Sequence, residues 1–246
     1  MAKILFLGMS LIFFSATMAV AAEQNFETDI VKTAQGDLVI TCIGHGTLMM
    51  SFGGKIIHID PVSQMADYSQ LPKADLILVT HEHSDHLDLQ AIEKTKTGKT
   101  VLVITENVAK QVRDGIVMKN GDEKMIAGFR IEAVPAYNII HMRSPGVPYH
   151  AKGVGNGYII SFGDKRVYIA GDTENTPEMK SVRNIDIAFL PMNLPYTMTP
   201  EMVADAAKAI LPKILYPYHY GKTDTQKLIE LLRDEKNIEV RIRKMM

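Results

Sequence analysis

The chain has 246 residues, of which 46% are hydrophobic, and a formal net charge of −1. This length and composition fit a single α/β domain with a sizeable core. The balanced charge, with no block of Lys or Arg and no interleaved aromatic stripe, argues against nucleic acid as a partner. We therefore expect a small-molecule partner, and the oligomeric state stays open.

The N-terminus differs from the rest of the chain. Lys3 precedes an apolar stretch over residues 4–14, and small residues follow at 19–22. A short apolar core with a positive flank and an A-x-A-like end is typical of a secretory signal, and it is too short for a stable membrane span. We expect a signal peptide over residues 1–22 and an exported protein, periplasmic or secreted, with no stable membrane span after cleavage. An uncleaved membrane anchor is the alternative.

Short runs rich in Val, Ile, Leu and Tyr end near Gly, Pro or Asp and predict β-strands. They cover residues 38–43, 47–52, 55–59, 76–80, 100–104, 129–134, 158–162, 166–170, 185–190 and 213–218. Two other segments show helical spacing: TPEMVADAAKAI (199–210), with Thr199 as N-cap and Pro200 in the first helical position, and TDTQKLIELLRDEK (223–236). The mixture predicts an α/β fold.

One sequence pattern occurs twice. SFGGKIIHID (51–60) reappears as SFGDKRVYIA (161–170), and each copy predicts two strands joined by a Gly-containing turn. A further apolar strand follows each copy at a similar distance. A chance resemblance of two hairpins is the alternative, but the matching order favours two duplicated β-rich halves that pack their sheets face to face with helices outside.

Three observations on the sequence indicate structural residues or argue against covalent catalysis. The only cysteine, Cys42, lies in an apolar strand, which favours a buried and inert thiol and excludes an intrachain disulfide. His58 lies inside a hairpin strand and is predicted to be a packed histidine. No G-x-S-x-G motif occurs, so covalent serine or cysteine catalysis has no support.

Three histidines and one aspartate fall within six positions of VTHEHSDHLD, directly after a predicted strand. His81 and His83 are two apart, so they would point to different sides of a helix but to the same side of an extended strand end. A turn after them would bring Asp85 and His86 toward a neighbouring metal. Imidazoles and a carboxylate suit Zn²⁺, with Fe or Mn allowed by ligand type. Two metals would need further ligands from elsewhere.

Other candidate ligands follow strands or lie in loops. Asp172 ends RVYIAGD and His219 follows the apolar ILYPY, although alone each would be unremarkable as a helix cap or a core histidine. His141 and His150 lie in the long Pro- and Gly-containing loop NIIHMRSPGVPYHAKG, the kind of segment in which binding loops occur. His45 lies between two glycines in GHGT.

These residues carry a family resemblance. T-H-E-H-S-D-H (80–86), the distant Gly171-Asp172 pair and the late His219 resemble the metallo-β-lactamase-fold hydrolases. GHGTLMMSFGGKIIHIDP resembles the branch that includes ascorbate-6-phosphate lactonase-like and N-acyl phosphatidylethanolamine phospholipase D-like enzymes. The resemblance covers nearly the whole mature chain. It implies a four-layer αβ/βα sandwich, which the duplicated halves indicate independently, and a single metallo-hydrolase domain over residues 23–246.

The resemblance also implies which residues bind metal. The first metal would be bound by His81 and His83, the second by Asp85, His86 and His219, with Asp172 as the bridge. This chain departs from the pattern after P-A-Y, where relatives often have a histidine and this sequence has Asn138. Either Asn138 coordinates through its carbonyl oxygen or a loop histidine substitutes, and a mononuclear site is a further alternative. YHAKGVGNGY resembles a segment of an A-Y-N subgroup, which favours His150 over His141.

The predicted chemistry is hydrolysis by a metal-bound hydroxide. Two divalent cations, Zn²⁺ first and Mn or Fe as alternatives, would lower the pKa of a shared water and polarise the bond under attack. Asp85 is the predicted catalytic residue, because it would hold the hydroxide together with Asp172 and take a proton during turnover. Asp60 is expected to brace the metal-site loops from its strand end.

Positive residues predict the kind of substrate. Arg143 and Lys152 share the long loop with the candidate histidines, and Lys222 follows His219. If they line the site, they would suit phosphate or carboxylate, and the alternative is that they are ordinary solvated charges. The resemblance implies an ester, lactone or phosphodiester bond, and these charges favour a small anionic substrate. An exported metal-binding protein without hydrolytic turnover is the competing function.

Overall fold

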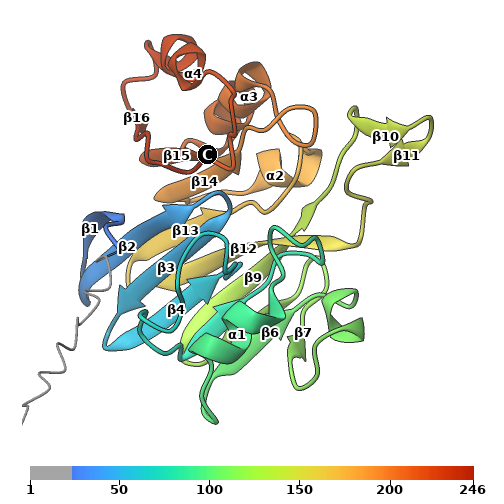
Figure 1. Ribbon diagram of the computed structural model, residues 1–246. Helices are drawn as coiled ribbons and strands as arrows, with labels where there is room; N and C mark the ends of the chain where they lie inside the picture. The colour runs from blue at the N-terminus through green and yellow to red at the C-terminus, as the bar shows by residue number, and fades with distance from the viewer. Residues whose placement is uncertain (1–23) are drawn as a thin grey trace, which may run out of the picture.

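The computed structural model describes residues 24–246, so the predicted signal peptide lies outside the described residues. Two seven-stranded sheets pack face to face (Figure 1). The first sheet contains, in spatial order, β1 (Glu27–Thr33), β2 (Gly36–Gly44), β3 (Thr47–Phe52), β4 (Lys55–Ile59), β5 (Leu76–Leu78), β6 (Val101–Ile104) and β7 (Ile116–Val117). The second contains β16 (Glu239–Val240), β15 (Ile214–Tyr218), β14 (Ile187–Pro191), β13 (Lys165–Ile169), β12 (Gly155–Phe162), β9 (Phe129–Ala136) and β8 (Glu123–Ile126).

The two sheets share one internal plan. Strands β1 to β4 pair antiparallel and β4 to β7 pair parallel. The second sheet repeats this order, since β8, β9, β12 and β13 pair antiparallel and β13 to β16 pair parallel. The repeated SFG segments form the β3–β4 and β12–β13 hairpins, whose turn glycines Gly53, Gly54 and Gly163 have positive φ. The predicted duplication is therefore confirmed as a repeat of topology.

The main core lies between the sheets, because the inward-facing apolar side chains of both meet there. Leu38 and Ile40 of β2 and Phe162 of β12 belong to one cluster and are fully buried. The rings of Phe52 and Phe162, one from each sheet, lie 5.5 Å apart between centroids. Burial of this apolar surface is the principal stabilising term of the fold.

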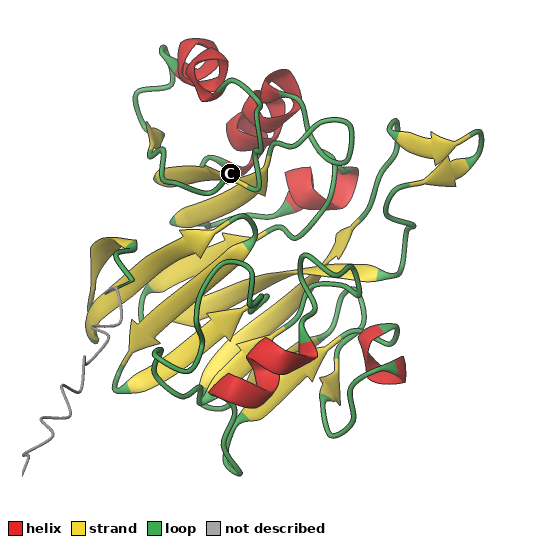
Figure 2. Cartoon of the chain, viewed as in Figure 1, coloured by secondary structure: helices red, strands yellow, loops and turns green. Residues whose placement is uncertain are grey.

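Helices cover the outer faces of the sheets, as Figure 2 shows. Helix α1 (Leu89–Thr95) packs Ile92 against Ile77 of the first sheet, near the 3-10 turn η1 (Val108–Lys110). The second sheet is covered by α2 (Pro177–Ser181), α3 (Pro200–Ile210) and α4 (Thr225–Leu232). The predicted four-layer αβ/βα sandwich is thereby confirmed. Of the helices in residues 24–246, none is long and apolar enough to span a membrane.

The predicted strands and both predicted helices are present, with small differences at their ends. Thr199 caps α3 as predicted, because its hydroxyl oxygen accepts a hydrogen bond from Met202 N at 3.2 Å. The prediction missed the edge strands β1, β7, β8 and β16, helices α1 and α2, and a hairpin formed by β10 (Met142–Ser144) and β11 (Val147–Pro148). This hairpin extends from the body of the protein in Figure 1.

Strand ends position the candidate ligands. Strand β5 ends shortly before His81, β13 ends shortly before Asp172, and β15 ends directly before His219. All three strands lie in the parallel parts of their sheets, so their carboxyl ends open toward one edge of the sandwich. His150 approaches the same edge after the β10–β11 hairpin, and His45 lies in the turn between β2 and β3.

Candidate metal centre

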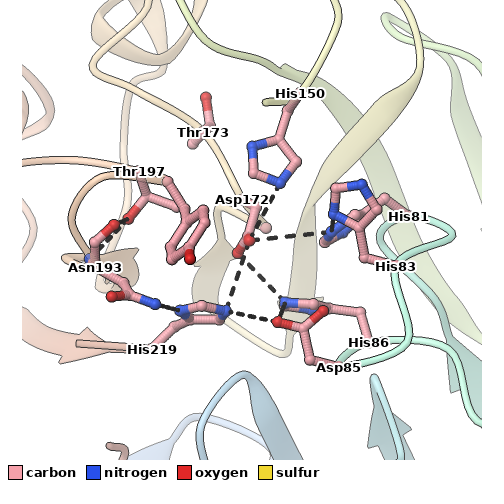
Figure 3. A network of polar contacts seen from close by, with 12 residues as sticks. His81, His83, Asp85, His86, His150, Asp172, Thr173, Asn193, Thr197 and His219 are labelled. Atoms are coloured by element: carbon pink, nitrogen blue, oxygen red, sulfur yellow. Dashed lines mark hydrogen bonds and ion pairs between the residues drawn. The ribbon is translucent and has the colours of Figure 1, made fainter. Parts of the chain in front are cut away.

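The structure brings together all seven predicted ligands, although they come from distant parts of the chain (Figure 3). Three sets of possible ligand atoms lie within 4.8 Å of one another: His81, His83 and His150; His45, Asp85, His86 and His219; and His81, His86 and Asp172. The first set matches the predicted first metal site. The second contains the predicted second site together with His45. We call these two sets the first and second ligand groups.

Asp172 lies between the two ligand groups. Its Oδ2 is 3.3 Å from His150 Nε2 in the first group and 3.5 Å from His219 Nε2 in the second. The same oxygen is 4.0 Å from His81 Nε2, and Oδ1 is 3.3 Å from His86 Nε2. This is the arrangement that a bridging carboxylate requires, as predicted for Asp172.

The donor set fits divalent metal ions. Ligands bound tetrahedrally to Zn²⁺ at its usual bond lengths lie about 3.4 Å from one another. The pair His81 Nε2 and His83 Nδ1 is 3.1 Å apart, and the pair His219 Nε2 and Asp85 Oδ2 is 3.4 Å apart. In addition, His86 Nε2 and Asp172 Oδ1 are buried and have no hydrogen-bond partner among the described residues. Unpartnered buried polar atoms are costly, and a cation would satisfy both.

Hydrogen bonds to the far side of the rings orient the histidines. Asp60 is fully buried, and its Oδ2 lies 2.7 Å from His86 Nδ1. The Asp60 carboxylate also accepts hydrogen bonds from the backbone N and the hydroxyl of Thr80, at 2.7 and 2.6 Å. The Thr80 hydroxyl in turn lies 3.0 Å from His81 Nδ1. Each contact leaves the Nε2 atom of its histidine facing the site, and Asp60 has the bracing position that was predicted for it.

Of the two predicted alternatives, the geometry favours a loop histidine over coordination by Asn138, because the Asn138 amide contacts His150. Its Oδ1 accepts hydrogen bonds from the backbone N of His150 at 2.8 Å and lies 2.8 Å from His150 Nδ1. Its Nδ2 donates to Glu174 Oε1 and to the carbonyl of Tyr196. The oxygen and the nitrogen of its side-chain amide are therefore both engaged by protein partners, namely His150, Glu174 and Tyr196. Asn138 orients His150, and His150 lies with His81 and His83 where the predicted substitute for the expected histidine would have to lie.

The predicted preference for His150 over His141 agrees with this geometry. His141 Nδ1 lies 2.8 Å from Glu174 Oε1, and His141 is in neither ligand group. Glu174 is fully buried and also accepts hydrogen bonds from the backbone N of Ile139, Ile140 and His141. Sequence reasoning missed Glu174, whose only local signal was its place two residues after Asp172.

His45 is the ligand-group member to which the sequence assigned no role. Its Nε2 is 3.2 Å from Asp85 Oδ2, and its ring centroid is 3.7 Å from that of His219. Its backbone has φ of 52°, and its carbonyl accepts a hydrogen bond from His219 N at 3.0 Å. The flanking glycines in GHGT were the available signal, because Gly46 allows His86 to lie against the turn: a Cβ at Gly46 would be 2.6 Å from His86 Cε1.

The charge states of the centre follow from burial and mutual contact. Burial alone would raise the pKa of Asp172, but His219, His86 and His150 outweigh it and hold that pKa well below its usual range. Burial lowers the pKa of His81, and the neighbouring His86 lowers it further. An ionised carboxylate and a neutral imidazole are the forms that bind metal. For His86, burial would lower the pKa, but Asp172 and Asp60 outweigh it and raise that pKa.

Residues 39–219 match the family model described as the β-lactamase superfamily domain. The match spans more than half of the chain. The chain belongs to this superfamily. It is also 33% identical over 199 residues to the UPF0173 metal-dependent hydrolase of Methanopyrus kandleri, covering 74% of this chain and 84% of that protein.

Two solved structures extend the comparison. One is from Parabacteroides distasonis and is titled as a proposed metal-dependent hydrolase; it is 50% identical with a TM-score of 0.86, covering 90% of this chain and 100% of that one. The metallo hydrolase Igni18 from Ignicoccus hospitalis, 24% identical with a TM-score of 0.69, covers 85% of this chain and 95% of its own and shares the fold. The protein is a metal-dependent hydrolase with the metallo-β-lactamase fold. Its assignment to the lactonase-like branch stays a prediction.

Two cavities open onto the centre of this hydrolase. A cavity of about 300 Å³ adjoins the first ligand group, and one of about 550 Å³ adjoins the second. Arg143 and Tyr149 line both. Of the predicted positive residues, Arg143 alone lines these cavities: Lys152 pairs with Glu178 at 2.7 Å outside them, and Lys222 lines neither.

Proposed function

We propose that this hydrolase binds two divalent cations, Zn²⁺ first and Mn or Fe as alternatives, and uses water to cleave an ester, lactone or phosphodiester bond of a small anionic substrate. The main support is the position of Asp172, whose two oxygens face histidines of both ligand groups at the junction of the two cavities. A substrate that reaches this point from either cavity would meet both groups at once.

Cations held by the two groups would supply Lewis acidity and lower the pKa of a bound water toward neutrality. Side chains of the protein would orient the water, accept its proton and bind the substrate. The Asp85 side chain is 47% exposed and lines the larger cavity. Its Oδ2 faces His219 and His45, so the other carboxylate oxygen can orient the attacking water and take its proton. Arg143, at the junction of the cavities, can hold an anionic group of the substrate.

Hydrolysis of bis-p-nitrophenyl phosphate, a lactone panel and p-nitrophenyl esters tests this proposal. Each substrate would be assayed with the protein as purified, after chelator treatment, and after return of Zn²⁺, Mn²⁺ or Fe²⁺. We expect turnover of at least one class that the chelator abolishes and a metal restores. No turnover of any class in a sample shown to contain two metals per chain would contradict the proposed bond classes.

We propose in addition that the protein is exported. The support is the sequence alone, namely Lys3, the apolar residues 4–14 and the small residues 19–22. Expression of the full chain in a Gram-negative host, followed by fractionation and mass measurement, tests it. We expect a periplasmic product that begins near residue 22 or 23. A cytoplasmic product of full length would contradict export.

A further inference from the structure

The smaller cavity differs in character from the larger one. Its walls away from the ligands are formed largely by apolar groups, among them Ala136, Val147, Pro148 and Val154. We call this cavity the apolar slot. The larger cavity has polar side chains in the corresponding places, including Ser84, Asn193 and Tyr196. The two sides of the metal centre would therefore receive chemically different parts of one substrate.

An acidic side chain in the wall of the apolar slot disfavours an anionic group of the substrate at that place. Glu82 lines the slot; its Oε1 accepts a hydrogen bond from Asn107 at 2.8 Å, and its Oε2 is buried with no partner among the described residues. An anionic group placed in the slot beside Glu82 would be repelled by this carboxylate. The slot is therefore suited to a neutral, apolar group.

Arg143 offers the place for the anionic group. It lies on β10, and its guanidinium carbon is 5.8 Å from the centroid of the Tyr149 ring. Tyr149 in turn packs edge-on against Tyr196, with centroids 5.0 Å apart, so the hairpin contacts the loop that borders the larger cavity. Within residues 24–246, no carboxylate lies in ion-pair distance of Arg143. A guanidinium that has no ion-pair partner among the described residues and that lines both cavities is available for an anionic ligand.

From these observations we infer that the substrate is amphiphilic: an alkyl or aryl group next to the scissile bond occupies the apolar slot, and an anionic group contacts Arg143. This inference rests on the proposed function, since it places the scissile bond at Asp172. It narrows the substrate class to esters, lactones or phosphodiesters with an apolar substituent on one side and a carboxylate or phosphate charge within reach of β10.

The test uses binding, so that it does not depend on turnover. Methyl-, butyl-, hexyl- and phenylphosphonate would be titrated into the Zn²⁺-loaded protein by calorimetry. The phosphonate group supplies the anion, and the substituent probes the slot. Burial of each added methylene should tighten binding about fourfold. Equal affinities for methyl- and hexylphosphonate would overturn the inference.

Substitutions locate the two subsites. Val154→Phe fills the slot and should bring the affinity for hexylphosphonate close to that for methylphosphonate, while methylphosphonate still binds within about twofold of wild type. Val147→Phe, at a half-exposed position of β11, should act in the same direction if Val154→Phe does not fold. Ile140→Phe is the matched control, because Ile140 is 68% exposed and lines neither cavity. An undiminished chain-length dependence in folded, metallated slot variants would overturn the assignment.

Arg143→Ala should lower the affinity for every phosphonate by a similar factor, about tenfold, and leave the dependence of affinity on chain length intact. Arg143→Lys should retain most of the affinity. Unchanged binding in Arg143→Ala would overturn the anion subsite. The outcomes are distinct from those of the activity assay. Affinity that rises with phosphonate chain length, without turnover of any substrate, would refute the proposed reaction alone. Turnover together with equal affinities for all phosphonates would refute the amphiphilic substrate alone.

Discussion

At residue scale, one amide orients the candidate ligand His150. Asn138 stands where the family resemblance leads us to expect a histidine, and its Oδ1 faces His150 Nδ1 at 2.8 Å. This contact requires a proton on Nδ1 and leaves Nε2 free for metal, 3.3 Å from Asp172 Oδ2. Glu174 fixes the amide from the other side. Asn138 therefore occupies an orienting position next to His150.

The first prediction separates the two loop histidines by metal content. His150→Ala should lose the metal of the first ligand group, because only His81 and His83 of that group remain beside Asp172. His141→Ala should keep its full metal content, because His141 contacts Glu174 and no member of the ligand groups in Figure 3. Metal analysis of both purified variants decides the matter. Full metal content in His150→Ala would refute the assignment.

A second prediction concerns the orienting amide. Asn138→Ala keeps His150 but removes the acceptor for both its ring and its backbone N–H. Loss of such an outer contact lowers metal affinity by about 10- to 100-fold. Competition with a chelator measures the affinity, and the visible spectrum of the Co²⁺ form reports the geometry. His141→Ala serves as a control with unchanged spectrum. A wild-type affinity and spectrum in Asn138→Ala would show that His150 needs no such contact.

At element scale, local pattern predicted the interior and missed the periphery. The central strands and α3 have dense apolar spacing and clear caps, so their sequence and their burial agree. Strand β1 alternates half-exposed and exposed residues, and β10 is fully exposed, so neither shows the apolar run by which the other strands were found. These elements are held by pairing with a neighbour, which single-sequence patterns do not reveal.

The same reasoning explains which part of the site was predictable. His81 to His86 are close in sequence, so a local signal marked them. Asp172 and His219 follow apolar strands but were unremarkable alone, and the family resemblance singled them out. The contacts of His45 with Asp85 and of Asn138 with His150 depend on how loops meet across the two halves. The local sequence around these residues does not specify which loops come into contact.

A third prediction tests the turn between β2 and β3. Gly46→Ala would place a Cβ 2.6 Å from His86 Cε1, so the ring must move away from Asp60. We expect a loss of about 1–3 kcal/mol in the free energy of unfolding and weaker metal binding. Gly98→Ala is the matched control, since a Cβ at that position would have no neighbouring atom within 4 Å. Denaturant titration and metal analysis measure both effects. Equal behaviour of the two variants would contradict the close contact.

At the scale of the whole molecule, His58 contributes to the pH dependence of stability from a position away from the metal centre. Burial lowers the pKa of His58 from 6.5 to about 4, partly offset by the carbonyl of Pro72. Between these values the unfolded chain binds a proton that the folded chain does not, so stability falls as the pH falls from 6.5 toward 4. The free energy of unfolding of His58→Gln should therefore fall by about 2 kcal/mol less than that of wild type between pH 7 and pH 5. Urea unfolding of chelator-treated wild type and His58→Gln at several pH values measures this difference. The same pH dependence of the free energy of unfolding in both proteins would contradict the prediction.

Metal binding should also connect the two halves of the molecule. Each ligand group combines first-half residues with a second-half histidine, His150 in one group and His219 in the other. A metal that binds only the folded chain stabilises it by about 2.7 kcal/mol at a free concentration 100 times its Kd. Chelator treatment should therefore lower the unfolding midpoint, and Zn²⁺ should restore it. Asp172→Asn should show a much smaller difference, because it weakens the bridge. Thr199→Ala is the control: loss of the α3 cap should cost both forms about 1 kcal/mol equally. Identical midpoints with and without metal would show that the two halves hold together without the ions.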